Sequence, residues 1–218
     1  KTGNHPSTIT TGEINGNNGF YVDVSSFTSN RYRTLIEGVG DINNDGINDI
    51  LFGNTYLLFG KNTSFSAEED ITNLNGVNGF KITSTPTVAS SGGDFNNDGI
   101  DDLLLGTYGR TVIIFGKSTP WNATVHSYSS SLSEAFIINS SLREYPIANL
   151  GDINGDGITD IILGKKERLY YDSSSSLYPG NAYVIYGFSA PDTEAPTITC
   201  PADQTLARGN VLPDYTSL

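Results

Sequence analysis

The sequence predicts an all-β protein built from three repeated units, and three observations support this prediction. An acidic box with the pattern D-x-N-x-D-G-x-x-D occurs three times. A short apolar strand that ends in an aromatic residue and a glycine follows each box, and a run led by an aromatic residue precedes it. No stretch has the 3.6-residue periodicity of an amphipathic helix. A repeat of this kind determines the architecture, because each unit must bury its apolar faces against its neighbours.

The acidic boxes set the spacing of the units. They lie in the segments 39–53, 92–106 and 150–164, and their first aspartates are 53 and 58 positions apart. Asn-Asp-Gly or Gly-Asp-Gly in each box indicates a tight turn, and the Ile- and Leu-rich run after it indicates a strand.

The flanking runs give each unit about four strands. The runs YLLFG, VIIFG and YVIYG end at Gly60, Gly116 and Gly187, and the runs GFYVDV, GFKITS and AFIINS begin 41, 37 and 52 positions before these glycines. Four strands at a period near 50 residues are typical of a propeller blade. A many-stranded β-sandwich is the alternative, but it does not explain aromatic-glycine pairs at fixed places. We expect four-stranded, propeller-type blades over residues 19–61, 79–117 and 135–188, with an N-terminal segment 1–18 and an extended C-terminal tail 189–218.

Composition excludes several classes of protein. The 218 residues carry a net charge of -12, with 24 acidic and 12 basic residues, so the chain repels a phosphate backbone and nucleic-acid binding is excluded. The apolar runs are too short for a membrane span, which needs roughly 20 residues. The chain contains no Met, even at its first position, and we expect a processed N-terminus or a cut inside a longer chain.

The third unit has a longer loop, from Lys165 to Asn181, before its aromatic-glycine pair. The loop holds Lys165, Lys166 and Arg168, the main basic cluster of this acidic chain. It is either a solvated loop or a contact site for an acidic neighbour or a glycan.

The boxes present the ligands that a hard cation prefers. Positions 1, 3, 5 and 9 carry carboxylate or amide oxygens, position 7 can offer a backbone carbonyl, and Ca²⁺ takes 6–8 oxygen ligands. Glycine at position 6 permits the backbone reversal. We expect three Ca²⁺ sites. Their predicted ligands are Asp41, Asn43, Asp45, Ile47 and Asp49; Asp94, Asn96, Asp98, Ile100 and Asp102; and Asp152, Asn154, Asp156, Ile158 and Asp160, with the isoleucines contributing carbonyl oxygens.

Other interpretations of the boxes fit less well. An EF-hand needs Glu at position 12, where this chain has Phe52, Leu105 and Leu163. Mg²⁺ prefers to keep its waters, and soft metals disfavour an all-oxygen site. An ordinary Asx-turn would account for one box, but three boxes in phase with the strands favour a cation.

Residues 19–188 resemble three FG-GAP repeats, the blades of the integrin alpha-subunit β-propeller. The resemblance is carried by Phe59-Gly60, Phe115-Gly116, Tyr186-Gly187 and the three boxes. It implies a four-stranded blade with Ca²⁺ in the loop between its inner strands. The "GAP" half of the motif is absent. Family propellers usually have seven blades and three cannot close a ring, so we expect further blades outside this sequence or a propeller that is open or completed between subunits.

The tail has a different composition. Pro191 to Pro196 indicates a linker, and the segment 192–205 resembles the opening of a hyalin-type repeat, an immunoglobulin-like extracellular module. Cys200, the single cysteine, cannot form a disulfide within this chain. The resemblance implies a partner cysteine outside the sequence; a free thiol and a disordered proline-rich tail are the alternatives.

Several features predict a secreted or cell-surface protein. Loops of this type suit the millimolar Ca²⁺ outside cells. Sequons at Asn62, Asn122 and Asn139 are candidate glycosylation sites, although their number is no higher than chance predicts for a chain rich in Asn, Ser and Thr.

The function predicted is that of a non-catalytic, calcium-binding structural or adhesive repeat protein within a larger chain or filament. The two histidines, His5 and His126, are isolated, and no nucleophile elbow or phosphate loop occurs. Expected partners are adjoining blades or identical subunits, and possible ligands are glycans or extracellular proteins. The alternative function is a calcium-stabilised lectin. Its stacking aromatics would be Trp121, Tyr170, Tyr171 and Tyr178.

Overall fold

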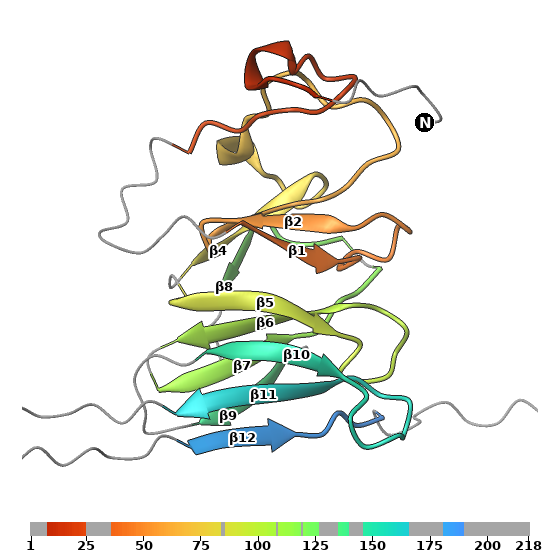
Figure 1. Cartoon of the computed structure of the whole chain (residues 1–218), viewed down its shortest axis with the longest axis vertical. Helices are drawn as coiled ribbons and strands as arrows, with labels where there is room; N and C mark the ends of the chain where they lie inside the picture. The colour runs from red at the N-terminus through yellow and green to blue at the C-terminus, as the bar shows by residue number, and fades with distance from the viewer. Residues whose placement is uncertain are drawn as a thin grey trace, which may run out of the picture.

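The computed structural model describes residues 8–24, 36–83, 86–107, 109–118, 120–126, 135–139, 146–165 and 181–189. These residues form three largely antiparallel sheets stacked along the long axis of the molecule (Figure 1). The predicted all-β class is therefore confirmed. The helices in the described ranges are two 3-10 turns, η1 (Thr11–Glu13) and η2 (Ile71–Asn73), and no helix there is long and apolar enough to cross a membrane.

Sheet 1 has the strand order β1-β2-β3-β4-β8. Its strands are β1 (Ile36–Gly40), β2 (Asp49–Phe52), β3 (Tyr56–Leu58), β4 (Gly79–Thr83) and β8 (Thr124–His126). Neighbouring strands are antiparallel, except that β8 runs parallel to β4. The turn between β2 and β3 contains Gly53 and Asn54, both with positive φ, the conformation that glycine and asparagine tolerate best.

Sheets 2 and 3 repeat this arrangement. Sheet 2 has the order β5-β6-β7-β9, and the described part of sheet 3 has the order β10-β11-β12. In every sheet the acidic box joins the first strand to the second, and the register of that strand pair shifts just before the box. The strands are β5 (Val88–Gly93), β6 (Asp102–Thr107), β7 (Arg110–Ile114), β9 (Ala135–Asn139), β10 (Ile147–Gly151), β11 (Asp160–Lys165) and β12 (Asn181–Ile185).

The aromatic-led strands differ from the predicted grouping. The repeat pattern predicts GFKITS and AFIINS at the start of the second and third units. In the structure β4 pairs with β3 and β9 pairs with β7, so each completes the sheet that precedes it. The reason is that the third strand of a sheet has a free edge, which a later apolar run fills in the antiparallel direction. Between β7 and β9 the chain first contributes β8 to sheet 1. The sheets therefore do not follow the boundaries 79–117 and 135–188.

The core lies between the stacked sheets. Leu103 and Leu105 of β6 face sheet 1 and join a cluster with Leu57 and Phe80. Leu104, between them, points to the opposite face and packs in a cluster with Ile161 of sheet 3 and others. Because successive side chains of a strand alternate in direction, the central β6 is buried on both faces, and all six of its residues are buried.

A third, smaller cluster lies at the far side of sheet 1. Phe52, Leu58 and Ile71 are buried there, and Phe20 and Phe65 pack against them. The N-terminal segment 8–24 thus lies at the sheet 1 end of the stack, and β12 lies at the opposite end (Figure 1).

Candidate metal centre

Each acidic box forms a tight loop closed by the same hydrogen bonds. In the first loop the carboxylate of Asp41 accepts the backbone N–H groups of Asp45, at 3.0 Å, and Gly46, at 2.7 Å. The carboxylate of Asp45 in turn accepts the N–H of Ile47 at 2.9 Å. The second and third loops repeat these contacts with Asp94 and Asp98 and with Asp152 and Asp156.

The asparagine at position 3 links positions 1 and 5. Asn43 accepts the N–H of Asp45 at 3.2 Å through Oδ1, and its Nδ2 donates to Asp45 Oδ2 at 3.0 Å. Asn96 and Asn154 make the same two contacts in their loops. The three polar side chains of each loop therefore gather over the same turn of backbone.

The aspartate at position 9 is buried and ties the loop to the sheet. Asp49 accepts the N–H of Ile42 at 2.9 Å and the N–H of Gly60 at 2.8 Å. Asp102 and Asp160 do the same in their sheets, with Gly116 and Gly187 as the second donors. All three aspartates are fully buried.

This contact explains why an aromatic-glycine pair recurs in each unit. The glycine N–H must approach the buried carboxylate closely, and a side chain would block the approach. A Cβ on Gly60 would lie 2.5 Å from the carbonyl oxygen of Asn48, and a Cβ on Gly116 would lie 2.3 Å from that of Asp101.

The pKa of Asp49 and of Asp102 is raised to about 7, mainly by burial and to a smaller extent by the carboxylates at positions 5 and 1 of each loop. The backbone N–H donors act in the opposite direction but do not offset the loss of hydration. Negative charge is thus concentrated at a place where water cannot stabilise it. A divalent cation in the loop would favour the ionised form.

Position 4 is a functional position that the box pattern alone does not single out. Asn44 and Asn97 both have φ of 57°, the left-handed region, two residues before the glycine at position 6. Their side chains donate across to the following sheet, from Asn44 to Ser118 at 3.1 Å and from Asn97 to Ser189 at 2.9 Å. The repeated Asn-Asn before Asp-Gly was the available signal, because Asn tolerates this conformation best among residues with side chains.

The first two loops are covered by the next sheet, and the third is open. The residues at position 2, Ile42 and Phe95, are fully buried, and their carbonyl oxygens accept the N–H groups of Lys117 and Phe188 at 3.0 Å. The corresponding Ile153 of the third loop is 59% exposed.

The structure brings the predicted side-chain ligands of each box into one loop, but it does not aim them at a common centre. Across the described ranges, no group of three or more Asp, Glu, His or Cys side chains is arranged to hold a metal ion. The physical reason is visible in the hydrogen bonds: each carboxylate is turned toward backbone N–H donors. The donor set is still all oxygen, as Ca²⁺ requires, and calcium binding stays a prediction.

The other predicted site residues have mixed outcomes. Asn62, Asn122 and Asn139 are exposed. Trp121 is 7% exposed and stacks on Phe80 with 4.6 Å between ring centroids, so the prediction of a sugar-stacking face there is wrong. The side chain of Lys165 lies outside the described part of the structure. The other residues singled out in the sequence lie wholly outside it: His5, Lys166, Arg168, Tyr170, Tyr171, Tyr178 and Cys200.

No protein-family model, curated protein or solved structure matches this chain.

Proposed function

We propose that this protein is a non-catalytic, calcium-binding structural or adhesive repeat protein of the extracellular space, built from FG-GAP-like blades. One observation carries the proposal. The same loop, with the same oxygen-bearing side chains and the same hydrogen bonds, occurs between the first two strands of all three sheets.

Electrostatics supports the choice of a divalent cation. Four oxygen-bearing side chains share each loop, and three of them are aspartates. In the first two loops the buried aspartate has a pKa near 7, because its ionised form lacks compensation. Ca²⁺ would supply that compensation. Three such ions would reduce the net charge of the chain from -12 to -6.

A structural role follows from where the loops lie. The first two loops are sandwiched against the following sheet, through contacts such as the N–H of Lys117 on the carbonyl of Ile42. An ion that rigidifies the loop therefore also fixes the junction between two sheets. Rigid stacking of repeats suits a scaffold or adhesive protein.

Thermal unfolding with and without calcium tests the proposal. The ion binds the folded loop and hardly binds the unfolded chain, so Ca²⁺ at 100 times the dissociation constant adds about 2.7 kcal/mol per independent site. We expect a melting temperature several degrees higher in Ca²⁺ than in chelator.

Two controls isolate the loops as the cause. Mg²⁺ at the same concentration should raise the melting temperature far less. The triple variant Asp45→Asn, Asp98→Asn and Asp156→Asn changes only exposed side chains and should abolish the response. A melting temperature that calcium leaves unchanged would contradict the proposal.

A further inference from the structure

Among the described residues, the third sheet shows no fourth strand at the edge where the other two sheets carry one. In sheet 1 the third strand is flanked by β4, and in sheet 2 by β9. Among the described residues, β12 pairs with β11 alone. Val184 of β12 is 43% exposed, whereas its counterparts Leu57 and Ile113, two residues before the aromatic of the aromatic-glycine pair, are fully buried. No strand from the described part of the chain covers this edge.

The N-terminal segment resembles the segment that leads into β4, the fourth strand of sheet 1, although it forms only an isolated bridge, at Tyr21. Residues 14–20, INGNNGF, match residues 74–80, LNGVNGF, which lead into β4. The turns are the same: the N–H of Gly16 donates to the carbonyl of Gly19, and that of Gly76 to Gly79, both at 2.8 Å. A 3-10 turn precedes both segments.

The surroundings of the two segments match as well. Phe20 stacks on Phe65 at 4.3 Å, as Phe80 stacks on Trp121. The N–H of Tyr21 donates to the carbonyl of Ala67 at 2.9 Å, as that of Lys81 donates to Ala123 at the same distance.

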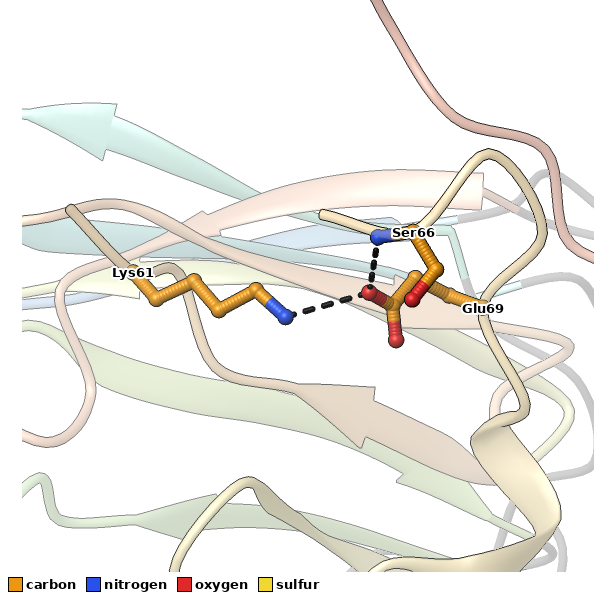
Figure 2. Close-up of polar contacts among 3 residues, drawn as sticks. All are labelled: Lys61, Ser66 and Glu69. Carbon is orange, nitrogen blue, oxygen red and sulfur yellow. Dashed lines mark hydrogen bonds and ion pairs between the residues drawn. The ribbon is translucent and has the colours of Figure 1, made fainter. Parts of the chain in front are cut away.

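The loop that receives the N-terminal segment is held in place by polar contacts. Lys61 pairs with Glu69 at 3.1 Å, and the same carboxylate oxygen accepts the N–H of Ser66 at 2.8 Å (Figure 2). Lys61 also lies 4.2 Å from the centre of the Phe65 ring. One edge of the segment 19–22 is thus engaged by this loop. The other edge of the segment 19–22 corresponds to the edge of β4 that pairs with β3, the third strand of sheet 1.

The two ends of the stack also expose positions that neighbouring sheets bury elsewhere in the molecule. Position 2 of the box is buried by the next sheet in sheets 1 and 2 but exposed at Ile153 in sheet 3. In the first strands, Ala89 and Ile147 are 4% and 7% exposed because a preceding sheet covers them, while the matching Ile36 of β1 is 58% exposed. Each end therefore exposes a position that a neighbouring sheet buries elsewhere in the stack, and the other end could supply such a neighbour.

We propose that the edge of β12 opposite β11 binds the segment 19–22 of a second copy of this chain, with sheet 3 of one copy stacking on sheet 1 of the next. The proposal rests on the repeat architecture of the proposed function. It is argued from strand pairing and does not depend on calcium binding. Within one copy, the two surfaces lie at opposite ends of the stack (Figure 1) and do not meet.

The two internal sheets fix the register of this contact. In sheet 1, Tyr56, Leu57 and Leu58 lie opposite Lys81, Phe80 and Gly79. Sheet 2 has the same alignment relative to its aromatic-glycine pair. Transferred to the new contact, this alignment places Tyr183 opposite Tyr21, Val184 opposite Phe20, and Ile185 opposite Gly19.

The contact is head to tail, so it produces a closed ring or a filament. Two copies would bring six sheets together, within the four to eight blades of propellers. A closed dimer is therefore the smallest assembly that leaves neither surface exposed.

Disulfide trapping tests the register directly. In a Cys200→Ser background, a chain with Tyr21→Cys is mixed with a chain with Tyr183→Cys in saturating Ca²⁺ and a mild oxidant. Residues directly opposite in an antiparallel pair are close enough for a disulfide. We expect a covalent dimer that contains one chain of each kind. The double variant Tyr56→Cys, Lys81→Cys, which has the same alignment inside one chain, is the positive control.

A mixture of Tyr183→Cys with Val77→Cys is the negative control, because Val77 is 82% exposed and lies outside the proposed pairing. A dimer yield no greater than in this control, while the intramolecular control closes, would overturn the inference. A separate double variant, Tyr21→Cys with Tyr183→Cys in one chain, should not close a disulfide within a monomer, and such closure would overturn the inference too. The calcium-dependent rise in melting temperature, measured on the same chains, reports on the proposed function separately.

Discussion

At the scale of single residues, the aspartate at position 9 joins the box to the strands. Asp102 accepts two backbone N–H groups from positions 95 and 116, which are distant in sequence. The box pattern predicts this residue as a cation ligand, and its oxygen chemistry still fits that role. The tie to Gly116 could not be predicted from the pattern, because it depends on where the third strand ends in space.

The buried aspartates give a prediction for pH. Asp49 and Asp102 have a pKa of about 7 in the folded protein, above the ordinary value of 3.8. Between about pH 4 and 7 the folded state keeps protons that the unfolded chain has released. The free energy of unfolding therefore falls as the pH rises through this range, because the unfolded chain has fewer bound protons than the folded one. This stabilisation is fully present below about pH 4 and is lost as the pH passes 7.

Urea unfolding of metal-free protein measures this effect. We expect a lower free energy of unfolding at about pH 7.5 than at about pH 4.5, and a much smaller difference in the double variant Asp49→Asn, Asp102→Asn. Saturating Ca²⁺ should remove the fall, because the ion replaces the proton. Metal-free protein that is more stable at the higher pH would contradict the burial argument.

At the scale of elements, most strands were predictable and their partners were not; the predicted run GFYVDV forms only an isolated bridge at Tyr21, and β8 was not predicted. The apolar runs at the boxes and before the aromatic-glycine pairs all form strands. The alternation of a run says which faces are buried, but it does not say which neighbouring edge the strand will join. That is why the pattern groups β4 and β9 with the wrong sheets, while the turns, marked by Asn, Asp and Gly, lie where the sequence predicts them.

The central strand β6 gives a prediction for stability. Leu104 is fully buried between sheets 2 and 3, among Ile113, Ile161 and others. Leu104→Ala removes this packing and leaves a cavity, so it should lower the free energy of unfolding by about 2–5 kcal/mol. Val77→Ala, at an exposed turn, should change it by less than about 0.5 kcal/mol. Denaturant unfolding of the two variants gives the comparison, and equal values would contradict the assignment of β6 to the core.

At the scale of the whole molecule, a stack of repeated sheets was predictable from the period of the boxes. The difference between the two ends of the stack was not predictable. The match between INGNNGF and LNGVNGF becomes meaningful only because the turns at Gly16 and Gly76 have the same hydrogen bond. That the side chains at positions 1, 3 and 5 share one loop was predictable residue by residue, whereas their binding of calcium stays a prediction. Position 4 was not predictable, because its contact with the following sheet depends on how the sheets stack.

The binding of one Ca²⁺ ion by each box is the central claim for the whole molecule. Equilibrium dialysis of the full chain against millimolar Ca²⁺ measures this directly. We predict three bound ions per chain, and two in each of the single variants Asp45→Ala, Asp98→Ala and Asp156→Ala, because repeats contact only their neighbours and the remaining loops keep their structure. A folded chain that binds no calcium, or a single substitution that removes all bound ions, would contradict it.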